Sequence, residues 1–144
     1  MPIVDVMSPR LVHVEPSTSV RDAIHRMAEA EVGSVAVCEG SRLVGIFTER
    51  DVLRLAGEAV DLDAMAVEAA MTRDVVTVSA DDDILAAARL MGERRIRHLP
   101  VVQGENLLGV VGIRDVLGAL AEQLWRTRDE AARETVHELL SRRS

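Results

Sequence analysis

Two short segments combine a carboxylate with a cation where a helix is expected to begin. They are Thr48-Glu49-Arg50-Asp51 and Gly112-Ile113-Arg114-Asp115. A carboxylate can accept hydrogen bonds from two adjacent hydroxyl groups at once, because it has two oxygens. The free N–H groups of a helix N-terminus favour an anion, and the arginine before each aspartate could reach a phosphate. Both segments therefore suggest a binding site for a polar, anionic ligand.

The first segment also has a purely structural interpretation. Thr48 and Asp51 have the spacing of a capping box, in which the threonine caps the helix and the acid bonds back to it. In the second segment Gly112 has no side chain to cap with, yet Asp115 is present. This favours a separate role for the aspartate, although an acid in the first turn of a helix is favourable in any case.

A basic run offers a further anion site. Arg94-Arg95-Ile96-Arg97-His98 is a concentration of positive charge in an acidic chain, which makes it a better candidate than the same run in a basic one. The alternative is that Arg97 and His98 are a solvated pair before a strand.

Both segments belong to an internal repeat with a period of 64 residues. Residues 7–53 align with residues 71–117 without a gap, and 14 of the 47 pairs are identical, where this composition gives about three or four by chance. The identity is unbroken from Arg50 to Leu53 and from Arg114 to Leu117. Two copies suggest a tandem pair with a pseudo-two-fold axis.

Each copy predicts a β-α-β-β-α unit. Apolar residues spaced i, i+3, i+4 and i+7 indicate an amphipathic helix in both copies, and Ser17 and Asp81 are the predicted N-caps. A Gly-bearing turn between two apolar segments predicts a hairpin, and a second helix begins near Thr48 or Ile113. The fold class is therefore α/β (α+β). The predicted strands are 11–14, 34–38 and 43–47, with 75–78, 98–102 and 107–111 as their counterparts, and the first helices are 20–28 and 84–91.

A unit of about 55–60 residues is marginal alone, so the two copies should pack together and share a core. We expect one repeat at 1–60, a second at 61–120 and a C-terminal amphipathic helix at 121–144 that continues the last helix of the second repeat. A helix is also predicted at 64–71, in the linker. In the tail, Asp129/Arg133 and Glu138/Arg142 are i,i+4 pairs of opposite charge. Trp125 could anchor the tail to its own pair or to a dimer partner, while the alternative is a solvated extension.

These features together resemble the cystathionine β-synthase (CBS) domain family over residues 1–120. The resemblance rests on the tandem β-α-β-β-α pattern, on the segment Gly45–Asp51 with its echo Gly109–Asp115, and on three short motifs: Met7-Ser8, Met71-Thr72 and Leu99-Pro100-Val101-Val102. It implies a regulatory module whose two repeats form a disc-like pair with two clefts. Such clefts often bind AMP, ADP, ATP, NAD or S-adenosylmethionine, and such pairs commonly form homodimers.

The resemblance also implies roles for individual residues. Asp51 and Asp115 would bind ribose hydroxyls. Phosphate would be held by Thr48 and by the basic side chains Arg50, Arg97, His98 and Arg114. Adenine would lie between the apolar residues Ile46, Val110, Ala36 and Pro100, and main-chain groups near His13 and Thr77 would read its edge.

The chain departs from the family pattern at two places. Gly112 replaces the usual threonine or serine of the second repeat, so one phosphate donor is lost there. In the first repeat Gly33-Ser34 stands where Arg97-His98 stands in the second. The two clefts are therefore expected to be unequal, with at most one binding strongly in any given ligand class.

Composition excludes several other classes. The 144 residues carry a net charge of −7, with one Trp, one Phe and no Tyr, so the core must be aliphatic and there are no aromatic platforms for nucleic-acid bases. An acidic chain is a poor prior for a nucleic-acid or membrane partner. No apolar run approaches the roughly 20 residues that span a bilayer, and the start lacks a signal peptide. With one cysteine, these features predict a cytoplasmic protein.

Other chemical groups give weaker signals. Asp81-Asp82-Asp83 suits the start of a helix better than a metal site, and the four histidines have no metal-ligand spacing. Cys38 lies in an apolar strand and is expected to be a buried structural thiol. No catalytic set is evident, so we expect no enzyme and no required cofactor. The leading interpretation is a CBS-pair sensor of an adenosine-containing ligand. The alternative is an interaction module that dimerises and docks a partner enzyme or transporter without sensing a ligand.

Overall fold

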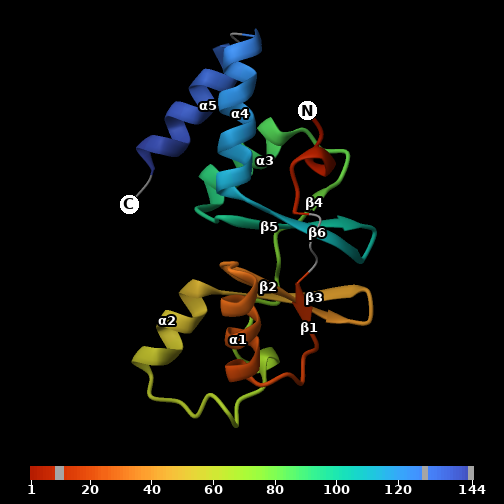
Figure 1. The fold of residues 1–144 in the computed structure, drawn as a ribbon, viewed down its shortest axis with the longest axis vertical. Coiled ribbons are helices and arrows are strands. Elements are labelled where there is room, and N and C mark those ends of the chain that lie inside the picture. The colour runs from red at the N-terminus through yellow and green to blue at the C-terminus, as the bar shows by residue number, and fades with distance from the viewer. Residues whose placement is uncertain (9–11, 128–129, 143–144) are drawn as a thin grey trace. The chain divides into compact units, whose positions relative to one another are not determined.

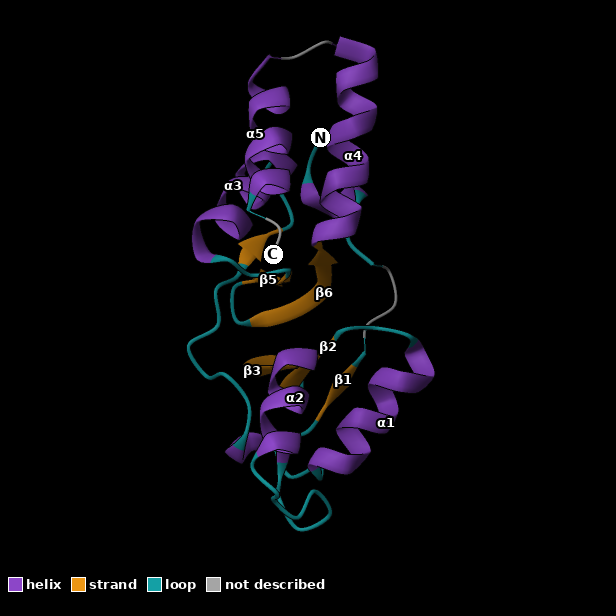
Figure 2. Cartoon of the chain, turned by 90° about the vertical axis from the view of Figure 1, so that its left-hand side faces the viewer, coloured by secondary structure: helices purple, strands orange, loops and turns teal. Residues whose placement is uncertain are grey.

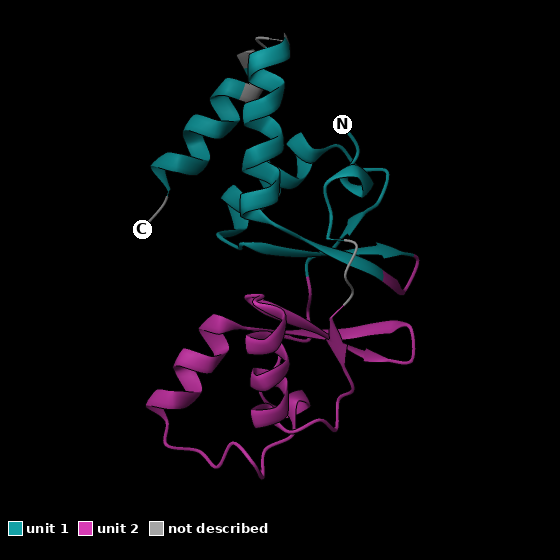
Figure 3. Cartoon of the chain, in the orientation of Figure 1, with its two compact units in different colours: residues 1–9, 76–103, 108–144 teal, residues 10–75, 104–107 magenta. Residues whose placement is uncertain are grey.

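The computed structural model describes residues 1–8, 12–127 and 130–142. Leu11, in the first predicted strand, and Asp129, in a predicted ion pair, lie outside the described residues. Contacts along the chain divide it into two compact units (Figure 3). Unit 1 comprises residues 1–9, 76–103 and 108–144, and unit 2 comprises residues 10–75 and 104–107.

Unit 2 contains the elements of the first repeat (Figure 1). Strand β1 pairs in parallel with β2, and β2 pairs antiparallel with β3 through a hairpin turn at Gly40, whose φ is +63°. Arg42 of β3 also lies opposite Asn106, the first residue of strand β6, which belongs to unit 2 with the rest of residues 104–107. The elements are β1 (His13–Val14), α1 (Val20–Ala30), β2 (Ser34–Glu39), β3 (Arg42–Thr48), α2 (Glu49–Gly57) and the 3-10 turn η2 (Val67–Ala69).

Unit 1 contains the equivalent elements of the second repeat, with helices shown in purple and strands in orange in Figure 2. Strand β4 pairs in parallel with β5, as β1 does with β2. The elements are η1 (Ile3–Asp5), β4 (Val78–Ser79), α3 (Ile84–Arg94), β5 (His98–Gln103), β6 (Asn106–Gly112), α4 (Ile113–Thr127) and α5 (Glu130–Ser141).

The backbone confirms the 64-residue repeat. Strands β2 and β5, strands β3 and β6, and helices α1 and α3 have bounds that differ by 64 residues at both ends. The left-handed residues repeat as well. Glu31 and Arg95 end the two helices at φ 54° and 55°, and Gly40 and Gly104 turn the two hairpins at φ 63° and 62°. The predicted α/β class with two β-α-β-β-α units is therefore confirmed.

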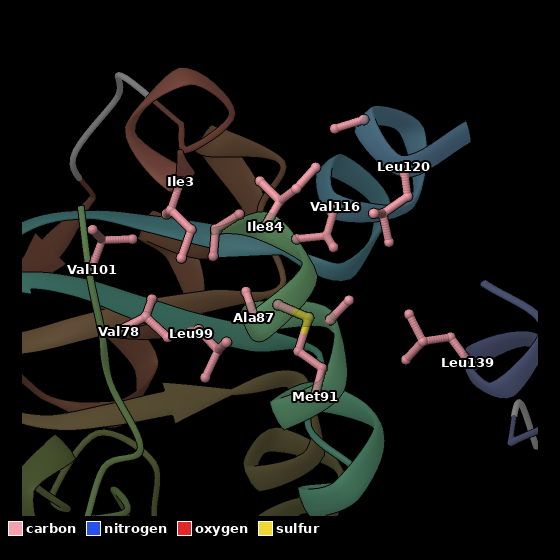
Figure 4. Packing of buried hydrophobic residues seen from close by; sticks show 13 residues of the cluster. Ile3, Val78, Ile84, Ala87, Met91, Leu99, Val101, Val116, Leu120 and Leu139 are labelled. Atoms are coloured by element: carbon pink, nitrogen blue, oxygen red, sulfur yellow. The ribbon is translucent and has the colours of Figure 1, made fainter. Parts of the chain in front are cut away.

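Both cores are built from aliphatic side chains. In unit 1, Ile3, Ile84, Leu99 and Leu120 are fully buried in one cluster, and Figure 4 shows them together with Met91. In unit 2 the cluster surrounds Phe47, the sole phenylalanine of the chain. Burial at about 25 cal/mol per Å² of apolar surface is the main stabilising term for each core.

The 3-10 turns are exchanged between the repeats. Turn η1 comes before the strands and helices of the first repeat in sequence but belongs to unit 1, where Ile3 donates its N–H to the Asp82 carbonyl at 2.8 Å. Turn η2 precedes the second repeat but belongs to unit 2, where Val67 donates to the Thr18 carbonyl at 2.7 Å. Each unit thus needs a segment that the sequence places before the other repeat.

The prediction of a helix at 64–71 is wrong, because only the turn η2 forms there. The backbone of this segment pairs with the loop before α1 instead, with the Val20 N–H bonded to the Met65 carbonyl at 2.9 Å. Tertiary hydrogen bonds thus override the helix propensity of the alanines.

The predicted N-caps are also wrong by two residues. Ser19 caps α1 by accepting the Asp22 N–H at 3.1 Å, and Asp83 occupies the N-cap position of α3. Ser17 and Asp81 lie in the preceding turns. The cap belongs to the last extended residue before the helix, and both Ser19 and Asp83 have extended backbone torsions.

The tail forms two helices where one continuous helix was predicted. Helix α4 ends at Thr127 and α5 begins at Glu130, and α5 packs on α3 and α4. Leu139 of α5 is 4% exposed, and the Arg142 guanidinium donates to the Gly92 carbonyl. The predicted Glu138–Arg142 pair is confirmed at 2.9 Å. Trp125 is 87% exposed, so it anchors nothing within the described chain.

Candidate functional site

Asp51, the first predicted site carboxylate, is bonded to its own helix in unit 2. Its Oδ2 accepts the Thr48 backbone N–H at 2.9 Å and the Thr48 hydroxyl at 3.2 Å. Thr48 is the N-cap of α2, and the two residues form a capping box. The side chain of Asp51 is only 15% exposed. The structural interpretation of this segment is therefore correct for Asp51, whatever else the residue does.

Arg54, which the sequence did not single out, completes the environment of Asp51. Its guanidinium lies 3.4 Å from Asp51 Oδ1 and donates to the Ala70 carbonyl at 3.2 Å. Both carboxylate oxygens of Asp51 thus have partners from the same unit. Arg50, by contrast, is exposed and makes no hydrogen bond or ion pair among the described residues.

The other predicted residues of the first repeat lie in one row across unit 2. His13 lies opposite Ala36, Ala36 lies opposite Ile46, and Ile46 exchanges two backbone hydrogen bonds with Thr72 at 2.9 and 3.0 Å. Ile46 and Ala36 are buried, whereas His13 is exposed. The structure therefore brings the predicted apolar wall and the predicted edge-reading backbone onto adjacent strands.

The His13 carbonyl already has a partner. Val12 uses its carbonyl to accept the Ala36 N–H, so along the strand the next carbonyl points away from β2. The guanidinium of Arg26 in α1 reaches this group at 3.3 Å. Arg26 was missed by the sequence analysis, because a lone arginine on a helix is usually a solvated residue.

In unit 1, Asp115 makes no such bonds. A β-carbon placed on Gly112 would lie 3.6 Å from Asp115 Oδ2 and 3.9 Å from the Arg97 carbonyl, so the three residues are close together. The Ile113 N–H fixes this arrangement by donating to the Arg97 carbonyl at 2.9 Å. Within the described ranges, the side chains of Asp115, Arg114 and Arg97 are exposed and form no hydrogen bond or ion pair.

The structure thus brings Arg97 and its neighbour His98 to the N-terminal end of α4, beside Asp115. The equivalent bond in unit 2 joins the Glu49 N–H to the Gly33 carbonyl at 3.0 Å. The predicted difference in basic residues between the two repeats therefore falls at corresponding places in the two units. The end that carries the extra cations is the one whose aspartate has no partner among the described residues.

Pro100 and Val110 form the apolar part of the second repeat. Pro100 is buried in β5, and the Val110 carbonyl in β6 accepts the Ser8 N–H at 3.1 Å. Proline has no N–H, so Pro100 cannot make the bond that Ala36 makes to Val12. This explains why β4 begins at Val78 and leaves Thr77 outside the strand.

A depression of about 380 Å³ in unit 2 lies away from these residues. It is at the hairpin end of β2 and β3, whereas Thr48 is at the other end of β3. Arg42 in its wall is paired with Glu39 at 2.7 Å, and Arg73 donates to the Glu68 carbonyl at 3.2 Å. None of the predicted site residues lines it.

The remaining groups are a buried thiol and carboxylates and imidazoles that are not grouped as metal ligands within the described part of the chain. Cys38 is buried, as predicted, and burial raises the pKa of its thiol. Across residues 1–8, 12–127 and 130–142, no three His, Cys, Asp or Glu side chains are grouped to hold a metal ion. In the same ranges no helix has the length and apolarity to cross a membrane.

Comparisons with known proteins identify both repeats. The family model described as "CBS domain" matches residues 3–58 and again residues 67–122. These two matches begin 64 residues apart and end 64 residues apart, in agreement with the internal repeat. Helix α5 lies beyond the second match.

Three similar proteins illustrate the range of relatives. An uncharacterised 33.4 kDa protein of Thermofilum pendens is 37% identical over 128 residues, which is 88% of this chain and 42% of that protein. The structure of CBSX2 in complex with AMP has 31% identity and a TM-score of 0.73, covering 87% of this chain and 98% of that one. A CBS domain protein of Pyrobaculum aerophilum complexed with AMP has 26% identity and a TM-score of 0.77, covering 85% and 99%. The chain spans about half the length of the curated relatives it matches.

Proposed function

Because the chain belongs to the CBS domain family, we propose that it is a regulatory module that binds an adenosine-containing ligand and performs no catalysis itself. The observation that carries the proposal is the Asp115 carboxylate, which lies near the Arg97 backbone at the N-terminal end of α4; the side chains of Asp115, Arg97 and Arg114 are exposed and have no partner among the described residues. Exposed groups of opposite charge that do not pair with one another are available to a ligand that has hydroxyl groups and a negative charge.

The relatives support the ligand class. Two CBS proteins with 31% and 26% identity to this chain are described in complex with AMP. In this chain the ribose hydroxyls would bind Asp115, and the phosphate would bind Arg97, His98 and Arg114. The cations favour a phosphorylated ligand (AMP, ADP, ATP or NAD) over S-adenosylmethionine, which itself carries a positive charge.

Adenine would be held without aromatic stacking. Pro100 and Val110 supply the apolar contact, and the exposed main chain at Thr77 supplies hydrogen bonds to the edge of the base. Helix α4 adds the partial positive charge of its N-terminus, which favours the phosphate by about 0.3–1 kcal/mol. No step in this scheme requires a metal or a second cofactor.

The ligand acts by shifting an equilibrium. It stabilises whichever arrangement of the chain, or of the homodimer that the family resemblance implies, binds it more tightly. Sedimentation equilibrium with and without ligand tests the homodimer. A downstream partner would recognise the stabilised arrangement.

Thermal denaturation with AMP, ADP, ATP, NAD and S-adenosylmethionine tests the proposal. A ligand present at 100 times its Kd stabilises the folded state by about 2.7 kcal/mol. We expect a rise in Tm with at least one phosphorylated ligand and its loss in Asp115→Asn. The matched control is Asp74→Asn, since Asp74 is also exposed and unpaired within the described chain. If none of the five ligands raises Tm, the proposal fails and the alternative of an interaction module stands.

A further inference from the structure

The two repeats differ at three positions whose side chains contact the His13 carbonyl or the Asp51 carboxylate in unit 2. In unit 2, Arg26 donates to the His13 carbonyl, Thr48 donates to Asp51, and Arg54 lies against the other oxygen of Asp51. These are the polar groups that would otherwise read a base edge and bind a ribose. Groups of the same unit therefore already bond to the His13 carbonyl and to both oxygens of Asp51, and the two guanidinium groups stand where a nucleoside would have to approach these acceptors.

In unit 1 each of these three residues is replaced by one without a polar side chain. Sixty-four residues further along the chain, Arg26 corresponds to Leu90, Thr48 to Gly112 and Arg54 to Gly118. Leu90 packs against the core of unit 1. Within the described residues no side chain donates to the Thr77 carbonyl or to Asp115. The same backbone thus presents free groups in one unit and occupied groups in the other.

From this comparison we propose that Arg26 and Arg54 are specificity-determining residues that close the nucleotide site of the first repeat, so that the chain binds one adenosine ligand and binds it in the second repeat. The inference rests on the proposed function and extends it to stoichiometry and location. The arginines act as internal ligands, because a guanidinium can donate to the same carbonyl and carboxylate acceptors as an adenine amino group and ribose hydroxyls.

The free-energy balance favours the arginine contacts over a bound ligand in the first repeat. A ligand that enters the first repeat must break the bonds to His13 and Asp51, and the released guanidinium groups must find new partners. The intramolecular donors need no loss of translational freedom, whereas a free ligand loses it on binding.

The test is the stoichiometry of AMP binding by isothermal titration calorimetry, with the full chain. We expect wild type to bind one AMP per chain and the double variant Arg26→Leu/Arg54→Ala to bind two. Thr48 is retained so that α2 keeps its cap. The matched control is Arg21→Leu, which removes an arginine from the same helix. Because Arg21 pairs with Asp63 on the surface at 2.6 Å, this control should leave the stoichiometry at one.

A second pair of variants locates each bound AMP. Asp115→Ala should remove binding from wild type, whereas Asp51→Ala should not. In the Arg26→Leu/Arg54→Ala background, Asp51→Ala should return the stoichiometry from two to one. If the double variant does not show a wild-type circular dichroism spectrum, the single variants Arg26→Leu and Arg54→Ala are used in the same way, and each should show a second AMP site of lower affinity that wild type lacks.

The outcomes separate the two proposals. If wild type binds two AMP molecules, or if the folded variants still bind one, the inference is overturned and the proposed function stands. If wild type binds none but the double variant binds one through Asp51, closure of the first repeat is supported and the proposed site at Asp115 is rejected for AMP. If no variant binds AMP, both fail for this ligand.

Discussion

The thioether of Met71 packs directly onto Gly45 of β3, leaving no room for a side chain at residue 45. The neighbouring Thr72 bonds to Ile46 through two backbone hydrogen bonds, so the end of the linker is held along β3 at this point. The second repeat has the matching contact. A β-carbon on Gly109 would lie 3.1 Å from the Met7 sulfur and 3.1 Å from the Ser8 carbonyl oxygen. Gly45 and Gly109, the first residues of the segments Gly45–Asp51 and Gly109–Asp115, therefore have a packing role.

We predict that Gly45→Ala destabilises the fold by about 1 kcal/mol, the lower end of the usual cost of overpacking, because the added methyl group must displace the Met71 thioether, which is the flexible end of its side chain. Urea denaturation followed by circular dichroism measures the change. The control is Gly118→Ala, at an exposed position inside α4 with no atom within 4 Å of the added carbon. This control should stabilise the chain by about 0.5–1 kcal/mol, since alanine is the better helix former. Equal stability of Gly45→Ala and wild type would contradict the packing role.

Substitution of the two site aspartates should change different quantities: folding stability for Asp51 and ligand affinity for Asp115. Asp51→Ala removes a capping box and should cost about 1 kcal/mol of folding stability. Asp115→Ala removes no bond within the described chain, so its stability should stay within about 0.5 kcal/mol of wild type. Its affinity for the ligand should fall by about 1.5–3 kcal/mol, the usual loss for a charged hydrogen-bond partner. Equal melting-point losses for both variants would show that Asp115 is also a structural cap.

Adjacent leucines of α5 test whether this helix is part of the folded unit. Leu139 is 4% exposed and lies over Gly92, whereas Leu140 is 48% exposed. Leu139→Ala should cost about 2–5 kcal/mol, as for other large-to-small changes in a core. Leu140→Ala should change the free energy of unfolding by less than about 0.5 kcal/mol. Similar small effects from both would mean that α5 contributes little to stability.

Cys38 provides a probe of global unfolding. Burial raises the pKa of its thiol above the usual value of 9.0, so the thiolate is disfavoured in the folded state. A colorimetric disulfide reagent at pH 8 should therefore react with no thiol in the native chain and with one in guanidinium chloride.

The same shift gives a pH dependence. The folded pKa of Cys38 is the higher one, so its contribution to stability is complete below the unfolded pKa and is lost as the pH rises above about 9. Cys38→Ala should lack this part of the alkaline loss of stability. Rapid native reaction of the thiol at pH 8 would contradict the burial.

The repeat was predictable because it is encoded in local patterns. Apolar spacing, hairpin glycines and the shared Arg-Asp-Val-Leu run placed the hairpin strands and both helices of each copy, and Gly40 and Gly104 turn the hairpins as expected. The first strand of the second copy, predicted at 75–78, forms only at Val78–Ser79. The N-cap at Ser19 was also within reach, since Ser19 and Asp22 have capping spacing. Three polar residues in a row before α1 hid it.

The linker and the site asymmetry were not predictable in this way. Residues 64–71 look helical until the distant hydrogen bond between Val20 and Met65 is known. Likewise Arg26 looks like a surface residue until the structure shows its guanidinium at the His13 carbonyl. The significance of Arg26 follows from this contact together with its replacement by Leu90 at the equivalent position of the second repeat. Such long-range contacts depend on the whole fold and leave no local periodicity in the sequence.

The exchanged turns η1 and η2 bear on how the chain arose. Each unit takes its 3-10 turn from the segment that precedes the other repeat, and the exchange is reciprocal, with Ile3 and Val67 fully buried in the receiving cores. A domain-swapped dimer of a single ancestral repeat has this connectivity. Tandem duplication of its gene into one chain would preserve the exchange. It follows that cutting the chain between the repeats yields two halves that each lack a core residue. Separately expressed halves should regain the native fold only when they are mixed.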